Sequence, residues 1–310
     1  MSVNVLFAAT EDRWPQYEGP LSKEIAAAGV DAHIAQDIAP DEVDYIVYAP
    51  NSTVQDFAPF TRAKAVLNLW AGVEDIVHNP TLRLPLARMV DPALTQGMVE
   101  WVTGHILRLH LGMDAHIGAA PGTWAPKPPP LAFDTRVTVL GLGELGAACA
   151  GALAGLGFDV AGWSRSEKQI AGITCLHGDA GLRAALERAD YCVLLLPSTA
   201  ATENTLDRDS LALMPVGARI LNPGRGPLID DDALLGALDS GQIDHATLDV
   251  FRVEPLPAAH PYWTHPRVTV TPHIASETRA AYSAKTIAEN IRRGQAGLPF
   301  LHLVDRGAGY

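Results

Sequence analysis

The hydrophobic pattern from residue 136 onward alternates between short apolar runs and longer helical segments. The helical segments cover residues 144–156, 181–189, 208–214 and 231–241. Six runs of the kind found in buried strands cover residues 136–141, 159–164, 191–197, 218–223, 245–251 and 267–273. Strands that alternate with helices favour a parallel sheet with both faces covered. Six such strands match a complete doubly wound α/β fold, of Rossmann type.

The first part of the chain has the pattern of a smaller α/β unit, which we expect to be flavodoxin-like. Its apolar runs cover residues 3–9, 32–35, 45–50 and 65–70, with a helical segment at 21–29. Long helical segments follow at 93–113 and 276–297. The last segment comes after the final predicted strand, which suggests that the chain returns to the first unit. We therefore predict a discontinuous domain of residues 1–97 with 278–310, and a second domain of residues 98–277.

Composition narrows the range of partners. The chain has 310 residues, about two domains' worth, and its formal net charge of −12 argues against nucleic acid or an anionic membrane as a partner. An anionic small substrate is still compatible with this net charge, because a few cations in a cleft reverse the local electrostatic field. Cys149, Cys175 and Cys192 show no metal-ligand spacing and are expected to be reduced thiols. With no secretion signal or membrane-length apolar run, a cytoplasmic location is expected.

A glycine-rich turn follows the run at 136–141. Gly141, Gly143 and Gly146 have the G-x-G-x-x-G spacing, between a strand and a helix that opens with Glu144 and Leu145. In this context the pattern is typical of a dinucleotide site, in which the backbone approaches a pyrophosphate and the helix N-terminus favours its charge. The alternative is a glycine turn that serves packing alone.

The end of the second strand of this unit bears on which dinucleotide binds. An NAD site usually has Asp or Glu about 20 residues after the glycine turn. Here the strand ends in Ser164, Arg165 and Ser166, with Lys168 as a weaker second cation and no acid. Two hydroxyls and an arginine suit a 2′-phosphate, so the sequence predicts NADP(H) in preference to NAD. The alternative is that Arg165 is a solvated loop charge.

Three charged side chains follow the ends of later strands. Arg225 comes after the run at 218–223, Glu254 after the run at 245–251, and His273 ends the run at 267–273. Ligands of open parallel sheets bind at this edge, so we expect the three to form one site. Arginine binds a carboxylate with two parallel donors, histidine transfers a proton near neutral pH, and a neighbouring glutamate favours the imidazolium. Taken singly, each could instead be a surface charge or a strand-end cap.

In the first domain, the run at 65–70 ends at Trp70 and continues through Ala71 and Gly72. Small residues at such a turn expose backbone N–H groups that can bind an anion. Tyr48 ends another strand at a comparable edge. Trp70 and Tyr48 are therefore candidates for the substrate site, with core packing as the alternative for both.

Several motifs in order resemble those of the D-2-hydroxyacid dehydrogenases. They are GLGELG at 141–146, LPST at 196–199, NPGRGPLIDDDALLGALDSGQI at 222–243, LDVFRVEPLP at 248–257 and VTVTPHIAS at 268–276. Within this family the chain is similar to the bacterial glyoxylate/hydroxypyruvate reductase A branch. The resemblance implies that Arg225, Glu254 and His273 are catalytic. It also implies NADPH-dependent reduction of small 2-oxo acids to 2-hydroxy acids.

The same resemblance implies further site residues and a homodimer formed through the nucleotide domains. Ala71, Gly72 and Val73 would bind the substrate carboxylate through their N–H groups. The nicotinamide end of the cofactor would be lined by Pro197, Asp249 and Ser276. Two other functions stay open: an NAD-dependent dehydrogenase of another D-2-hydroxy acid, and a non-catalytic cofactor-sensing protein.

Overall fold

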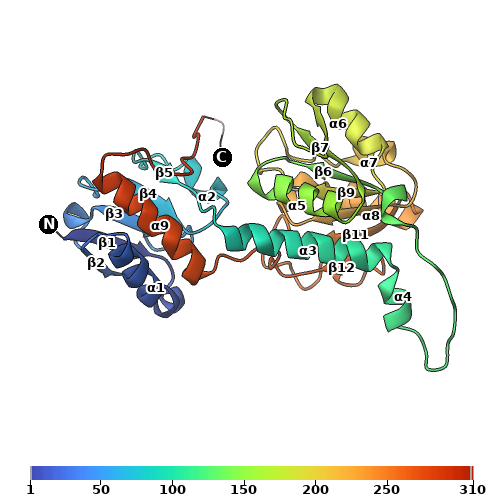
Figure 1. The fold of residues 1–310 in the computed structure, drawn as a ribbon, viewed down its shortest axis with the longest axis horizontal. Helices are drawn as coiled ribbons and strands as arrows, with labels where there is room; N and C mark the ends of the chain where they lie inside the picture. Colours follow the sequence, from blue (N-terminus) through green and yellow to red (C-terminus); the bar gives the residue numbers. More distant parts are fainter. Residues whose placement is uncertain (1, 308, 310) are drawn as a thin grey trace. The chain divides into compact units, whose positions relative to one another are not determined.

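The computed structural model describes residues 2–307 and 309. The chain divides into two compact units, Met1–Leu94 with Thr278–Tyr310, and Thr95–Glu277 (Figure 1). Each unit is built on one parallel sheet with helices packed on it. No helix among the described residues combines the length and the apolar character needed to cross a membrane.

The sheet of the first unit has five strands in the order β2-β1-β3-β4-β5. Its strands are β1 (Val3–Ala8), β2 (Ala32–Ala35), β3 (Tyr45–Tyr48), β4 (Ala65–Asn68) and β5 (Leu86–Ala87). This is the flavodoxin-like order that we expected. The two-residue strand β5 was not predicted, because it is too short to leave a periodic signal. Every pairing is parallel, so the carboxyl ends of β3 and β4 lie at one edge.

Two long helices of the first unit lie side by side (Figure 1). They are α1 (Trp14–Ala27) and α9 (Ala280–Gln295). Leu21 and Ile25 of α1 pack in one core with Ile287 and Ile291 of α9. Helix α1 begins seven residues earlier than the segment predicted at 21–29, and it accommodates Pro20 in its interior.

The sheet of the second unit has seven strands in the order β12-β11-β10-β9-β6-β7-β8. Its strands are β6 (Arg136–Leu140), β7 (Asp159–Ser164), β8 (Thr174–His177), β9 (Tyr191–Leu194), β10 (Ala218–Asn222), β11 (Ile243–Leu248) and β12 (Val268–Val270). The prediction of six strands was wrong by one. Strand β8 was not predicted, because this edge strand has no fully buried residue and its sequence has no apolar run.

Helices cover both faces of this sheet (Figure 1). The α-helices are α3 (Pro92–His110), α4 (Met113–Ile117), α5 (Glu144–Gly155), α6 (Gly178–Glu187), α7 (Arg208–Leu213) and α8 (Asp231–Ser240). The helical segment predicted at 93–113 is interrupted after His110, and Gly112 takes a left-handed conformation with φ of 62° before α4 begins. Helix α4 and the chain after it stand away from the sheet as an arm (Figure 1).

Short helical turns complete the two units. They are α2 (Glu74–Val77), η1 (Glu11–Arg13), η2 (Pro40–Glu42), η3 (Ala132–Asp134), η4 (Gly226–Leu228) and η5 (Pro261–Trp263). The cysteines have no disulfide partner among the described residues, in agreement with the prediction of free thiols. Burial raises the pKa of the Cys149 and Cys192 thiols to about 12, so neither is a reactive thiolate.

Candidate active site

The glycine turn joins β6 to α5, and its three glycines have different reasons to be glycine. Gly141 has φ of +105°, and a Cβ there would lie 2.5 Å from the carbonyl oxygen of Leu195. A Cβ on Gly146 would lie 1.7 Å from the oxygen of Gly141. Packing therefore requires these two glycines. A Cβ on Gly143 would meet nothing within 4 Å, so packing within the chain does not explain that glycine.

The N-terminus of α5 offers donors at the open side of the turn. Gly143 is the N-cap and has no side chain to cap the helix. In the described part of the chain, the N–H groups of Gly143, Glu144 and Leu145 have no acceptor. Lys168 donates from Nζ to the oxygen of Leu142 at 2.6 Å, which brings a cation to the same turn. Open backbone, unpaired N–H groups and a cation fit the pyrophosphate of a dinucleotide.

The end of β7 carries the residues predicted to distinguish NADP(H) from NAD. Ser164 is 8% exposed and donates from Oγ to the oxygen of Ser166 at 2.7 Å, which closes the turn. Arg165 and Ser166 are exposed. The strand ends without an acidic side chain, and the next acid in the chain, Glu167, lies beyond the turn. The local geometry is compatible with a phosphate-binding turn.

His273 and Glu254 form a close pair beyond the carboxyl ends of β11 and β12. The Nδ1 atom of His273 lies 2.6 Å from Oε2 of Glu254. The other carboxylate oxygen of Glu254 accepts from the N–H of Phe251 at 2.8 Å. Because Glu254 occupies Nδ1, Nε2 is the ring nitrogen left for a substrate. The pair is therefore built to deliver a proton at one defined atom.

The pair shifts both pKa values in the direction that keeps it charged. The hydrogen bond to Glu254 raises the pKa of His273 above 6.5, against the opposing effects of burial and of the Arg225 charge. Burial acts to raise the pKa of Glu254, but the hydrogen bonds from His273 and Phe251 and the charges of His273 and Arg225 lower it below 4.5. The pair therefore makes its full contribution to the stability of the fold between pH 4.5 and pH 6.5, the ordinary pKa values of the two groups. That contribution is lost as pH rises through the pKa of His273 or falls through that of Glu254.

Asp249 shapes the turn that carries His273. Its buried carboxylate accepts from Oγ1 of Thr271 at 2.5 Å and from the N–H groups of Ile274 and Ala275 at 2.9 and 2.8 Å. Its carbonyl accepts from the N–H of His273 at 2.9 Å. His273 itself has φ of 54°, a left-handed conformation that is uncommon for a residue with a Cβ. The carboxylate of Asp249 is thus engaged within the protein, where it holds that conformation.

Arg225 lies on a turn that is packed between two neighbouring strand ends. The side chain of Asn222, only 1% exposed, accepts from the N–H of Gly224 at 3.1 Å and donates to the oxygen of Arg225 at 2.9 Å. A Cβ on Gly224 would lie 2.7 Å from the oxygen of Leu194, and one on Gly226 would lie 2.0 Å from the carbonyl carbon of Phe251. Only glycines allow so close an approach, so the turn is rigid because it is tightly packed.

The guanidinium of Arg225 is also fixed from within the turn. Its Nη1 donates to the oxygen of Gly224 at 2.6 Å. Its charge acts on the pKa values of both His273 and Glu254, so the structure brings the three predicted residues together. Asn222 was missed by sequence reasoning. The available signal was a polar residue that directly follows the apolar run of a buried strand.

The remaining cofactor candidates lie around the same sheet. Pro197 follows β9, and its carbonyl accepts from Oγ1 of Thr202 at 2.6 Å. Ser276 follows the His273 turn and lies beside Gly97 of α3, where an added Cβ would be 3.7 Å from the Cα of Ser276. Both residues are partly exposed.

The candidate carboxylate site of the first unit follows β4. Asn68, 1% exposed, donates from Nδ2 to the oxygens of Trp70 and Gly72, both at 2.9 Å. These bonds turn the chain so that the N–H groups of residues 71–73 have no acceptor in the described part of the chain. Such a run of unpaired N–H groups is an anion-binding nest. Like Asn222, Asn68 is a strand-end asparagine that sequence reasoning missed.

The two aromatic candidates of the first unit have different environments. Trp70 is 39% exposed, so core packing does not explain it. Tyr48 is 1% exposed and packs edge-on against Phe57 with ring centroids 5.3 Å apart. The prediction that the Tyr48 side chain contacts substrate is corrected: it lies in the core, and its burial raises its pKa.

A family model described as "D-isomer specific 2-hydroxyacid dehydrogenase, NAD binding domain" matches residues 112–275, more than half of the chain. The chain belongs to this family. It is therefore an NAD(P)-dependent oxidoreductase, as predicted. The matched range contains the glycine turn and all three of the charged residues, Arg225, Glu254 and His273.

The similarity of this dehydrogenase to known proteins covers its whole length or nearly so. A glyoxylate/hydroxypyruvate reductase A from Serratia proteamaculans is 34% identical over 99% of this chain and 100% of its own. A D-isomer specific 2-hydroxyacid dehydrogenase from Xanthobacter autotrophicus Py2, solved with NADPH and MES, is 39% identical with a TM-score of 0.91 and full coverage of both chains. An NADPH-dependent glyoxylate/hydroxypyruvate reductase from Sinorhizobium meliloti, solved with NADP and sulfate, is 33% identical with a TM-score of 0.87, again with full coverage.

Proposed function

We propose that this dehydrogenase reduces small 2-oxo acids, such as glyoxylate and hydroxypyruvate, to 2-hydroxy acids with NADPH. The observation that carries the proposal is the 2.6 Å pair of His273 and Glu254 in reach of the Arg225 charge. Reduction of a 2-oxo acid needs a proton donor at the carbonyl oxygen and a cation for the carboxylate. These residues supply both.

The reaction needs one hydride and one proton. NADPH, when bound at the glycine turn, would supply the hydride chemistry. His273 gives its Nε2 proton to the carbonyl oxygen, and the neutral ring then recovers a proton from solvent. Glu254 keeps the ring charged before the transfer and fixes its orientation. Arg225 binds the carboxylate and polarises the carbonyl with its planar donors.

The anion-binding nest of the first unit is proposed as a second element of substrate binding. The N–H groups of Ala71, Gly72 and Val73 would hold the substrate carboxylate, and the exposed Trp70 would contact the substituent on the carbonyl. This is supported by the unpaired N–H groups and by the asparagine that orients the loop.

The cofactor site is proposed to use the glycine turn for the pyrophosphate, with Ser164, Arg165 and Ser166 at the 2′-phosphate. The nicotinamide end would lie against Pro197, Asp249 and Ser276. Since the Asp249 carboxylate is engaged within its turn, we infer that Asp249 acts by orienting that turn. The two structural neighbours solved with NADPH and NADP support a preference for NADP(H) over NAD.

Replacing Arg165 with alanine is expected to lower kcat/KM for NADPH by about 10- to 100-fold, because charged hydrogen bonds to a phosphate would be lost. The value for NADH should change little, since NADH has no 2′-phosphate. The measurement is the ratio of the two kcat/KM values. Arg183→Ala is the matched control, as this exposed arginine pairs only with Glu187 of its own helix among the described residues. An unchanged ratio in Arg165→Ala would make Arg165 a surface charge.

Replacing Glu254 with glutamine is expected to shift the alkaline limb of kcat/KM for reduction to lower pH. Reduction needs protonated His273, so activity falls as pH rises through its pKa, and loss of the carboxylate returns that pKa toward 6.5. The pH–rate profile measures the shift. Asp239→Asn is the control, because Asp239 pairs with His265 3.3 Å away in the same unit. A profile identical to wild type would exclude Glu254 from proton transfer.

The test of the function is oxidation of NADPH and NADH with glyoxylate, hydroxypyruvate, pyruvate and a phenyl-substituted 2-oxo acid. Turnover confined to NADPH and the small acids supports the proposal. Turnover with NADH alone supports an NAD-dependent dehydrogenase of another acid. No turnover with any of these acids, while either cofactor binds, would overturn the proposal that this oxidoreductase reduces small 2-oxo acids.

We further propose that the protein acts as a homodimer. The arm after α3 exposes large apolar side chains, among them Ile117 at 80% and Trp124 at 93%. Single chains rarely leave such side chains together in solvent, so the arm suits contact with a second copy. Light scattering in solution reports whether the mass is that of two chains.

A further inference from the structure

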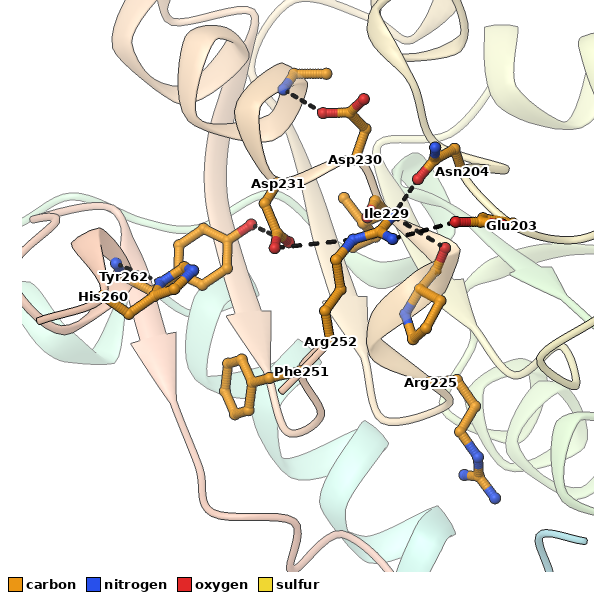
Figure 2. Close-up of polar contacts among 12 residues, drawn as sticks. Glu203, Asn204, Arg225, Ile229, Asp230, Asp231, Phe251, Arg252, His260 and Tyr262 are labelled. Carbon is orange, nitrogen blue, oxygen red and sulfur yellow. Dashed lines mark hydrogen bonds and ion pairs between the residues drawn. The ribbon is translucent and has the colours of Figure 1, made fainter. Parts of the chain in front are cut away.

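Arg252 follows β11, on the turn that also holds Glu254, and its side chain is 31% exposed. The guanidinium turns inward and donates to the oxygen of Ile229 at 2.7 Å and, more weakly, to that of Pro227 at 3.4 Å (Figure 2). These carbonyls belong to the turn that begins at Arg225 and continues through η4. One side chain therefore joins the Glu254 turn to the Arg225 turn.

Polar groups from two more segments surround the same guanidinium. Glu203 lies 3.4 Å away and Asp231 3.8 Å away, and Asn204 accepts a hydrogen bond (Figure 2). The carboxylate of Asp231 is in turn held by the hydroxyl of Tyr262 at 2.9 Å. Arg252 thus has fixed partners after β9 and at the start of α8, as well as in the Arg225 turn.

The Arg225 and Glu254 turns also meet backbone to backbone. A Cβ on Gly226 would lie 2.0 Å from the carbonyl carbon of Phe251. The side chain of Arg225 points away from the Arg252 cluster (Figure 2). Arg252 therefore lies on the side of the two turns that is opposite to the Arg225 side chain. From there it can control the separation of the turns without taking part in the chemistry.

We propose that Arg252 is a positioning residue that holds the Arg225 turn and the Glu254 turn in register. It acts on the reaction through them, by keeping the carboxylate-binding fork of Arg225 aligned with the proton donor that Glu254 orients. This rests on the proposed function. Misplacement of such groups by about 1 Å costs about 100-fold in rate. A clamp of purely structural value would alter stability and leave the kinetic constants unchanged.

The test compares Arg252→Met with Arg219→Met, which removes a matched guanidinium. Arg219 lies at the opposite end of β10, is also 31% exposed, and bonds Asp244 at 2.8 Å and the oxygen of Leu109 at 3.2 Å. We expect Arg252→Met to raise KM for glyoxylate and lower kcat, with kcat/KM down about 10- to 100-fold and the Kd of NADPH unchanged. Arg219→Met is expected to lower Tm with wild-type kinetic constants. Arg252→Lys retains the charge but replaces the rigid, planar five-donor guanidinium with one compact ammonium group, which does not reproduce the spread of its donors over both turns, so it should resemble Arg252→Met.

Hydrogen exchange measured by mass spectrometry provides a readout that needs no turnover. Arg252→Met should increase exchange in residues 223–231 and 250–255 together, while Arg219→Met leaves both segments unchanged. Unchanged exchange, or loosened segments with wild-type KM and kcat, would overturn the proposal. Full rescue by Arg252→Lys would overturn it too, since charge alone would then suffice. If the wild-type protein turns over no 2-oxo acid, the proposed function fails, and the exchange data still decide whether Arg252 joins the two turns.

Discussion

Replacing His273 with alanine is expected to lower kcat for 2-oxo acid reduction by about 10² to 10⁴ while NADPH still binds. The imidazole is the proton donor in the proposed reaction, and its Nδ1 is already occupied by Glu254 at 2.6 Å. Without it, water must protonate the carbonyl oxygen as the hydride arrives. The glycine turn and Ser164 to Ser166 are untouched by the substitution, so cofactor affinity should be retained.

Steady-state kinetics and NADPH fluorescence titration measure the two quantities. His265→Ala is the matched control, because His265 also pairs with a carboxylate, that of Asp239 at 3.3 Å, but precedes β12 instead of following it. The control is expected to retain wild-type kcat. Full turnover by His273→Ala would remove His273 from the mechanism. Loss of NADPH binding would show instead that the turn around Asp249 had collapsed.

Replacing Arg225 with lysine is expected to raise KM for 2-oxo acids and lower kcat/KM by about 10- to 100-fold. Lysine keeps the positive charge but lacks the planar pair of donors that meets a carboxylate and a carbonyl at once. It also loses the bond from Nη1 to the oxygen of Gly224, so the cation becomes mobile. The pKa of His273 should change little, because the charge beside it is retained.

KM and kcat with glyoxylate and hydroxypyruvate test this expectation, with the Kd of NADPH as the check on cofactor binding. Arg136→Lys is the matched control, since Arg136 makes a two-point contact with Asp190 at 3.1 and 2.8 Å at the amino end of β6. Loss of this two-point contact in Arg136→Lys should lower Tm without changing KM. If Arg225→Lys keeps both constants at wild-type values, Arg225 is a loop charge and the carboxylate is bound elsewhere.

The alternation of apolar runs with helical segments was sufficient to predict the fold class and all but two short strands. Strands β5 and β8 were missed because the first has two residues and the second is a partly exposed edge strand. The break after His110 was missed as well, since a single left-handed glycine does not disturb the surrounding helical pattern.

The three charged residues of the site were predictable because carboxyl ends of parallel strands share one edge. Knowing that each residue followed a strand was enough to bring Arg225, Glu254 and His273 together before any distance was known. The same reasoning could not distinguish Tyr48 from Trp70. In the sequence each stands near the end of an apolar run of the first unit, and only packing against Phe57 showed that Tyr48 is buried.

The sequence by itself determined which residue types stand at which strand ends, because that information is local. Strand, turn and helix propensities act over a few residues and are written directly in the order of the chain. Only the tertiary structure decided how these groups are held. Asp249 and Arg252 owe their roles to partners up to 49 residues away, and Gly226 to a contact with Phe251. Such contacts depend on how separate strands and turns pack, which no local pattern records.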